Sequence, residues 1–169
     1  ARKYRDDPIY LKGFGMAVDP LIPNARPKFS WTSFDALVQS SSQAYKMAGI
    51  KNPRKEIDLA EVHDCFSITE LAIYEDFGFS PRGGAREDIE SGFFELGGGL
   101  PVNTDGGLKC FGHPVGASGL RMVYEVYKQL QGKVDNPKRQ LRNVSRGLAH
   151  TFGGAPQVSA LVILGNEKG

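Results

Sequence analysis

Cysteine is scarce in this sequence, and neither sign of charge is in excess. The two cysteines, Cys65 and Cys110, are too few for a disulfide framework, and nothing at the N-terminus reads as a signal peptide. We therefore expect reduced thiols and a cytoplasmic location. The 21 basic and 19 acidic residues give a formal net charge of +2, without a dense basic segment. This balance argues against nucleic acid and against a membrane surface as partners.

Long apolar runs are also missing. None approaches the roughly 20 residues that cross a bilayer, and the C-terminal NEKG matches no targeting address. A chain of 169 residues can build one domain, because it buries roughly 70% of the surface that its unfolded form exposes. We therefore expect a soluble single domain over residues 1–169. Because the first residue is alanine, we also expect the chain to be a piece of a longer protein.

The first part of the chain contains a strand pattern and a helix pattern. Residues 8–18 are rich in strand-forming residues and precede a proline-rich loop. Apolar residues of helical period predict a helix over residues 32–48. Its expected N-cap is Thr32 or Ser33, and Gly49 is its expected C-terminal stop.

The segment DLAEVHDCFSITE, residues 58–70, concentrates ionisable side chains between two predicted elements. Residues 56–63 alternate apolar and polar side chains, which is typical of a strand. Ser67 and Glu70 fit a Ser-x-x-Glu capping box, which predicts a helix from there to residue 78. The sequence therefore places this segment at a strand-to-helix junction.

Glycine dominates residues 79–112, which we expect to be a long irregular connection. Within it we predict a short helix over residues 85–91 and extended pieces over residues 92–96 and 100–103. A connection of this length in a compact domain is usually functional.

The last part of the chain contains one more helix and two strands. Apolar side chains of helical spacing follow GHPVGASG and end at Gly132. Residues 141–150 and 157–165 predict a closing pair of strands. The resulting order β, α, β, α, loop, α, β, β indicates a layered α/β domain.

The three histidines, His63, His113 and His150, each lie at a turn or at the end of a predicted element. Three interpretations are open: ordinary surface or core histidines, a zinc site shared with the cysteines, and acid/base catalysis. The His-x-Cys and Cys-x-x-His spacings do not match a closed structural zinc site, so we expect no metal. A histidine titrates near neutral pH and favours the thiolate of a nearby cysteine. If the strand persists, His63 and Cys65 face the same side.

Small residues surround His113 in GHPVGASG. Gly112, Gly116 and Ser118 let another backbone or a ligand approach the start of the following helix, so we expect them to contact substrate. Free N–H groups at a helix start favour an anion or a developing oxyanion.

Together, VHDCF, NTDGGLKCFGHPVGASG and AHTFGG resemble the C-terminal half of a thiolase, of the branch related to sterol-carrier-protein thiolases. In that branch His-Asp-Cys-Phe replaces the Asn-Glu-Ala-Phe of degradative thiolases. The resemblance covers almost the whole chain, and the order and spacing of the three segments agree with it. It implies the C-terminal half of a thiolase fold, a layered α/β/α arrangement with a mixed sheet.

The resemblance also implies the chemistry: Claisen condensation, or thiolytic cleavage of a 3-oxoacyl-CoA, with coenzyme A as a substrate and no tightly bound cofactor. By analogy, His113 activates a nucleophilic cysteine, and Cys65 is the acid/base at the substrate α-carbon. His63 helps to hold a thioester oxygen, and the backbone around Gly153 helps to form a second oxyanion hole. His150 stands where degradative thiolases have a cysteine and has a supporting role.

The sequence departs from the family pattern in two places. The last segment reads HTFGG where this branch often reads His-Asn-x-Gly, so the role of His150 stays open. The nucleophilic cysteine and much of the coenzyme A site belong to the N-terminal half, which these residues do not include. We therefore expect the chain to act with an N-terminal thiolase half, in a homodimer or homotetramer, and to be inactive alone.

Two other functions stay open. Thiolase-like retro-aldolases work with an OB-fold, zinc-containing acyl-CoA-binding protein, but tyrosines would then take over the histidine and cysteine roles. A degenerate scaffold subunit would not need the complete set of His63, Cys65 and His113. Chain length and branching of the acyl group, and the direction of the reaction, cannot be read from these residues.

Overall fold

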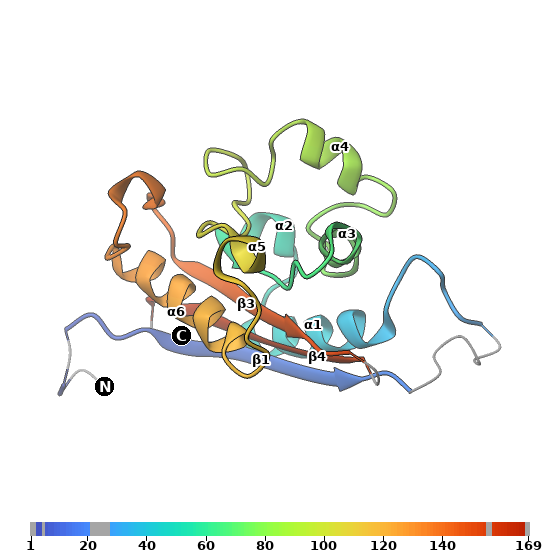
Figure 1. Cartoon of the computed structure of the whole chain (residues 1–169). Helices are drawn as coiled ribbons and strands as arrows, with labels where there is room; N and C mark the ends of the chain where they lie inside the picture. The colour runs from blue at the N-terminus through green and yellow to red at the C-terminus, as the bar shows by residue number, and fades with distance from the viewer. Residues whose placement is uncertain (1–2, 5, 21–27, 155–156, 168–169) are drawn as a thin grey trace.

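The computed structural model describes residues 3–4, 6–20, 28–154 and 157–167, which form a four-stranded sheet with helices on both faces (Figure 1). Along the chain the elements are β1 (Tyr10–Val18), α1 (Asp35–Ala48), α2 (Pro53–Glu56), β2 (Leu59–Glu61), α3 (Ser67–Asp76), α4 (Ala85–Glu90), α5 (Gly107–Phe111), α6 (Ser118–Gln131), the 3₁₀ helix η2 (Pro137–Arg139), β3 (Arg146–Phe152) and β4 (Val158–Gly165). The predicted order of strands and long helices is confirmed. Most of the predicted proline-rich loop lies outside the described residues.

The strands follow the order β1-β4-β3-β2 across the sheet. β4 is antiparallel to both β1 and β3, whereas β2 is parallel to β3, so the sheet is mixed as expected. Because β2 and β3 are parallel, their carboxyl ends lie at the same edge of the sheet. The segments HDCF and HTFGG therefore meet at that edge, although they are far apart in the sequence.

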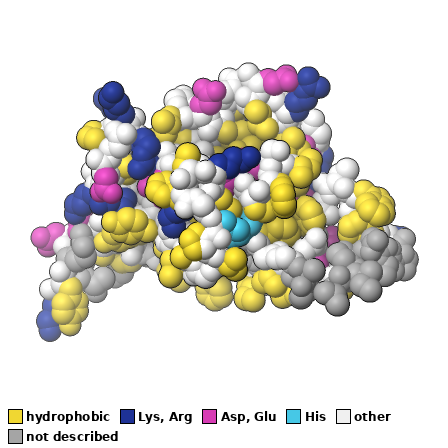
Figure 2. All heavy atoms as spheres, viewed as in Figure 1, with side chains coloured by type: hydrophobic (Ala, Val, Ile, Leu, Met, Phe, Trp, Pro, Cys, Tyr) yellow, Lys and Arg dark blue, Asp and Glu magenta, His cyan; other side chains and the backbone are white. Residues whose placement is uncertain are grey.

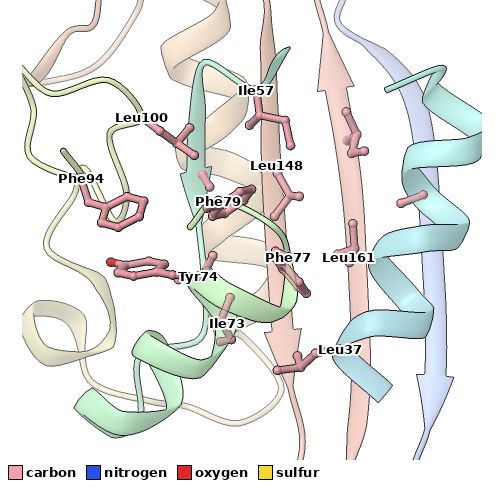
Figure 3. Packing of buried hydrophobic residues seen from close by; sticks show 14 of the residues in the cluster. Leu37, Ile57, Ile73, Tyr74, Phe77, Phe79, Phe94, Leu100, Leu148 and Leu161 are labelled. Atoms are coloured by element: carbon pink, nitrogen blue, oxygen red, sulfur yellow. The ribbon is translucent and has the colours of Figure 1, made fainter. Parts of the chain in front are cut away.

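Successive side chains of the strands enter two separate cores. α1 covers β1 and β4 on one face, and α6 covers β3 and β2 on the other. The first core joins Leu148 and Leu161 of the sheet to aromatic side chains such as Phe77, which follows α3 (Figure 3). The second core packs Met122 of α6 against Ala149 of β3. The predicted α/β/α layering is confirmed.

Helix α1 ends as the sequence predicts but begins differently. Gly49 takes a φ of 70° and stops the helix. The predicted N-cap at Thr32 or Ser33 is wrong, because Phe34 occupies that position and no side chain caps the helix from it. Instead, the Asp19 carboxylate accepts the Ala36 N–H in the first turn of α1 at 3.2 Å. The Asp76 carboxylate holds the chain just before the helix and accepts hydrogen bonds from Ser33 Oγ at 2.7 Å and from the Phe34 N–H at 2.8 Å. Carboxylates distant in sequence thus replace a local cap.

The strand predicted over residues 56–63 is wrong in its length. Only the three residues of β2 pair with β3, and the chain before them forms α2. Pro53 at the start of α2 favours that helical turn, because its fixed φ suits a helix and its missing N–H is not needed there. The HDCF segment is therefore a loop, and strand alternation no longer sets where its side chains point.

The predicted capping box is also wrong. α3 begins at Ser67 itself, and Phe66 is its uncapped N-cap residue. The Glu70 carboxylate points elsewhere and accepts hydrogen bonds from Tyr74 Oη and Asn103 Nδ2, each at 2.8 Å. Tertiary contacts therefore use the side chain that the local pattern assigns to the helix start.

Residues 79–112 are mostly irregular, as predicted, and carry the expected short helix α4 as well as the unpredicted α5. The extended piece predicted over residues 92–96 is wrong, because the chain turns there. In the piece over residues 100–103, Val102 forms a single bridge to Ala60. Tyr74 stacks on Phe94 with ring centroids 3.9 Å apart, which fastens the connection to α3. In the described part of the chain, no helix combines the length and apolar character of a membrane span.

Candidate functional site

A cleft of about 920 Å³ lies at the edge of the sheet where the chain leaves β2 and β3. Its wall combines the HDCF segment, the loop around His113 and the HTFGG segment. The lining residues are Phe34, His63, Asp64, Cys65, Phe66, Thr69, Leu108, Lys109, His113, Val115, Thr151, Phe152, Gly153, Gly154 and Gln157. The three side chains predicted to be catalytic therefore line one cleft.

The imidazole rings of His63 and His113 contact each other edge to face. Their centroids are 4.8 Å apart, and the ring planes differ by 79°. His63 is 3% exposed, and its buried Nδ1 has no hydrogen-bond partner among the described residues. Burial, followed by the positive charge that His113 can carry, lowers the pKa of His63 to about 4. His63 is therefore neutral at pH 7 and keeps one ring N–H that can donate a hydrogen bond.

The orientation of His113 is set by Ser118, in the first turn of α6. His113 Nδ1 lies 2.8 Å from Ser118 Oγ, and this hydroxyl donates to the Pro114 carbonyl at 3.2 Å. In the tautomer that carries its proton on Nδ1, His113 donates to Ser118 Oγ, and Nε2 is left as a proton acceptor. Ser118, which we expected to contact substrate, is 2% exposed and contacts the histidine instead.

Cys65 is exposed in the cleft wall, directly before α3. Its thiol lies 3.9 Å from Thr69 Oγ1, one helical turn further on. Cys65 and His63 share the cleft although no strand aligns them, because the loop after β2 turns both side chains to it. Cys110 is also exposed but does not line this cleft.

Asp64 connects the HDCF segment to the glycine pair at the start of α5. Its buried carboxylate accepts the Leu108 N–H at 2.8 Å. Gly107 has a φ of 65°, and a Cβ at that position would collide with the Asp64 carboxylate. The close approach and the positive φ therefore both require glycine at this position.

Asn103 is a supporting residue that the sequence analysis missed. It takes a φ of 50°, which is unusual for a residue other than glycine. Its Oδ1 accepts the Val62 N–H at 2.8 Å, and its Nδ2 donates to Glu70. Asparagine next to Thr-Asp-Gly-Gly is a turn signal, but the contact with the residue before His63 is not visible in the sequence.

His150 lies beneath the site rather than in the cleft wall. It is 1% exposed, and its Nε2 lies 3.1 Å from Ser159 Oγ. Phe77 contacts the ring edge to face, with centroids 4.8 Å apart. Burial lowers the pKa of His150 to about 3, with a smaller contribution from His63, so the ring is neutral.

The predicted glycine positions are distributed over two surfaces. Gly153 lines the cleft, and its N–H already donates to the Val158 carbonyl at 2.7 Å. Gly112 is exposed with a φ of 73° at the end of α5. Gly116 lines a neighbouring apolar groove instead of the cleft. Among the described residues, no group of three or more His, Cys, Asp or Glu side chains is placed to hold a metal ion.

Comparison with known proteins agrees with this geometry. The chain is 39% identical to an acetyl-CoA acetyltransferase of Methanothermobacter thermautotrophicus over 163 residues, 96% of this chain and 41% of that protein. It is 35% identical to sterol carrier protein 2 of Gallus gallus over 133 residues, 78% of this chain and 24% of that protein. The chain therefore spans less than half the length of these relatives.

A solved structure, the Ltp2-ChsH2(DUF35) aldolase, matches with a TM-score of 0.80 and 25% identity, over 100% of this chain and 43% of that one. Residues 24–166 match the family described as thiolase C-terminal domain-like. That match covers most of the chain and all three motif segments. The chain belongs to the thiolase C-terminal domain-like family, in the branch related to sterol carrier protein 2.

Proposed function

We propose that this chain is the C-terminal half of an acyltransferase that condenses acyl-CoA thioesters or cleaves a 3-oxoacyl-CoA with coenzyme A. The observation that carries the proposal is the convergence of His63, Cys65 and His113 on one cleft. A thiolase needs a base for its nucleophile, an acid/base at the α-carbon and donors to two oxyanions. Coenzyme A is a substrate in this proposal, and no resident cofactor takes part.

In the cleavage direction, His113 Nε2 accepts the proton of a nucleophilic cysteine supplied by another domain. The thiolate attacks the 3-oxo carbonyl, and the bond between C2 and C3 breaks. The electron pair passes to C2 as the enolate of the CoA thioester that carries C1 and C2, and Cys65 donates the proton that converts this enolate to product. The acyl group remains on the nucleophile as a thioester.

Free coenzyme A completes the cycle. Cys65, now a thiolate, takes the proton of the coenzyme A thiol, and the coenzyme A thiolate attacks the acyl-enzyme thioester. The nucleophilic cysteine leaves and regains its proton from His113. The N–H of neutral His63 donates to the thioester oxygen when this oxygen carries the enolate charge, a contribution of about 3 kcal/mol for a well-placed donor. The condensation direction reverses these steps, with Cys65 accepting the α-proton.

The missing nucleophile is proposed to come from an N-terminal thiolase half in the same full-length protein. An apolar groove of about 560 Å³ lies between β1 and the start of α6, beside the cleft. Its exposed side chains include Phe14 and Met16 of β1 at 54% and 59%, and Val115 and Leu120 at 85% and 73%. Hydrophobic side chains are visible at the lower front surface of the molecule, around an exposed histidine (Figure 2). A second domain of similar size on this groove would bury this apolar surface and place its cysteine near His113.

A second candidate function is a thiolase-like retro-aldolase with a zinc-containing OB-fold partner. The likeness to the Ltp2-ChsH2(DUF35) aldolase favours it. Retention of the histidine and cysteine positions, where we expect tyrosines in that class, favours the acyltransferase. The two reactions differ in substrate, since a retro-aldolase cleaves a 3-hydroxyacyl-CoA without using coenzyme A.

The test uses the full-length protein with a 3-oxoacyl-CoA and free coenzyme A. Loss of the 3-oxo thioester is followed for wild type, Cys65→Ala and His113→Ala, with Cys110→Ala as a matched control outside the cleft. We expect the first two variants to lose on the order of 10² to 10⁴ in rate and Cys110→Ala to keep the wild-type rate. Unimpaired thiolysis in the two cleft variants would contradict the assigned roles. Cleavage of a 3-hydroxyacyl-CoA by the wild type, without thiolysis, would select the aldolase.

A further inference from the structure

Arg121 of α6 contacts residues in or next to two of the motif segments of the site. Its guanidinium pairs with Asp105, in the loop before the glycine pair, and its Nη1 lies 3.5 Å from Glu61 Oε2 at the end of β2. The guanidinium carbon is also 5.2 Å from the centre of the Phe111 ring, two residues before His113. One side chain, half-buried but with its guanidinium nitrogens shielded from solvent, therefore contacts the strand before His63, the turn before α5 and the approach to His113.

Glu61 is held in place from two sides. It is fully buried, and its Oε1 accepts hydrogen bonds from the Thr104 N–H at 2.8 Å and from Thr104 Oγ1 at 3.1 Å. Its Oε2 has no hydrogen-bond partner among the described residues, so the charge of Arg121 is what balances that oxygen. Burial raises the pKa of Glu61 to about 8, and Arg121 opposes that rise, so the carboxyl group is largely protonated at pH 7 and ionised above pH 8. Loss of Arg121 would remove the cation that faces this buried carboxyl group, two residues from His63.

The two histidines need such a link because nothing bonds them directly. His63 follows β2, whereas His113 is oriented by Ser118, one helical turn before Arg121. The rings meet only through an edge-to-face contact. Among the ion pairs of the described residues, the one between Arg121 and Glu61 is the one that joins α6 to β2.

We propose that the Arg121–Glu61 pair is a positioning element that sets the separation of His63 and His113. Neither side chain lines the cleft, so the pair acts through the backbone of the two segments. Its effect on turnover rests on the function proposed above. Its effect on the imidazole rings does not, because ring geometry can be observed without substrate.

The same polar layer offers a matched control. Glu125 of α6 shares Thr104 with Glu61 and pairs with Arg139 of η2 at 2.8 Å. That ion pair is also buried in part and joins α6 to η2, and Arg139 Nη1 donates to the Thr104 carbonyl at 3.1 Å as well. Arg139→Gln therefore removes a charge pair of the same polar layer, with its contact to Thr104, while Arg121 still faces Glu61.

The experiment compares Glu61→Gln, Arg121→Gln, the double variant and Arg139→Gln in the full-length protein. We expect the first two to lower kcat for thiolysis about 10- to 100-fold, with KM within about threefold, because a misplaced catalytic group impairs reaction more than binding. The double variant is expected to lose no more than the worse single variant, since the two side chains form one unit. Arg139→Gln is expected to keep kcat within about threefold of wild type, although we expect the loss of its ion pair to lower the melting temperature.

The second readout is the ¹⁵N NMR spectrum of labelled histidine rings in the same proteins. We expect the ring signals of His63 and His113 to shift or broaden in Arg121→Gln, and to match wild type in Arg139→Gln. If Glu61→Gln fails to fold, Arg121→Lys tests the same link, and partial recovery of kcat relative to Arg121→Gln is expected. Wild-type ring signals and a kcat equal to that of Arg139→Gln would overturn the proposal. Absence of thiolysis in the wild type would overturn the proposed function alone, and the ring signals would still decide on the positioning pair.

Discussion

The Asp64 carboxylate accepts the backbone N–H of Leu108 at 2.8 Å, which joins the HDCF segment to α5. This contact crosses 44 positions of the sequence, and both residues line the cleft. It exists because Gly107 has no Cβ, so the carboxylate can approach the backbone. The geometry of His63 and Cys65, on either side of Asp64, depends on it.

Gly107→Ala is expected to destabilise the protein more than a positive φ alone explains. Gly132, with a φ of 68° and open space around it, is the matched control, because alanine there suffers backbone strain without a collision. We expect Gly132→Ala to cost about 1 kcal/mol and Gly107→Ala at least about 1 kcal/mol more, since Asp64 must move and its hydrogen bond is lost. Urea unfolding of the full-length protein measures both. Equal costs would contradict the close approach.

Ser118→Ala is expected to weaken catalysis by removing the hydrogen bond that orients His113. A neutral hydrogen bond of roughly 0.5–1.5 kcal/mol corresponds to a loss of about two- to tenfold in kcat/KM. Ser41→Ala is the control, because Ser41 is a buried helix serine whose hydroxyl, among the described residues, donates to the Val38 carbonyl of its own helix. If Ser118→Ala changes KM but not kcat, the hydroxyl contacts substrate rather than setting the tautomer.

Acidification is expected to reduce stability through the buried histidines. His150 has a pKa of about 3 in the folded state, below its ordinary value of 6.5, so the unfolded state binds more protons as the pH falls through 6.5. The stability present above pH 6.5 is therefore lost progressively down to about pH 3, by at most about 1.4 kcal/mol per pH unit. His150→Asn removes this titration. The free energy of unfolding, measured by urea unfolding at several pH values between 4 and 7, should then depend less steeply on pH than in wild type. An unchanged pH dependence would contradict the burial of a neutral imidazole.

Leu120→Asp is expected to destabilise the full-length protein if the apolar groove binds the N-terminal half. Leu120 is 73% exposed in this chain, and Ile89 of α4, at 44%, is the control away from the groove. We expect Ile89→Asp to lower the free energy of unfolding by less than about 0.5 kcal/mol and Leu120→Asp by about 2 kcal/mol or more. The difference arises because the aspartate at position 120 would be buried under the N-terminal half. Similar small costs in thermal or urea unfolding would show that the groove stays open.

Sequence periodicity predicted α1 and α6 because each has one apolar face and a glycine stop. The β3–β4 pair was predictable because its second strand is a nearly continuous apolar run. It failed at Ser33 and at Glu70, where local capping rules compete with tertiary partners. Asp19 accepts the Ala36 N–H at the start of α1, and Glu70 accepts hydrogen bonds from Tyr74 and Asn103. Such contacts join positions far apart in the chain, so no local pattern predicts them.

The chemistry of the site was easier to predict than its supports. His63, Cys65 and His113 stand out because their side chains ionise and lie beside turns. Ser118 and Asn103 belong to residue types that occur in any turn or helix start, and their partners become visible only in the fold. The short length of β2 also escaped prediction, because alternating residues form a strand only where a neighbouring strand pairs with them.

The most direct test of the separate roles of Cys65 and His113 combines two measurements on the full-length protein. One is the exchange of the α-hydrogens of an acyl-CoA with D₂O, and the other is the rate of acyl-enzyme formation. We expect Cys65→Ala to form the acyl-enzyme at near the wild-type rate but to lose exchange by on the order of 10² or more. His113→Ala is expected to lose acyl-enzyme formation, because its nucleophile keeps its proton. Wild-type exchange in Cys65→Ala, or wild-type acylation in His113→Ala, would contradict this account of the site.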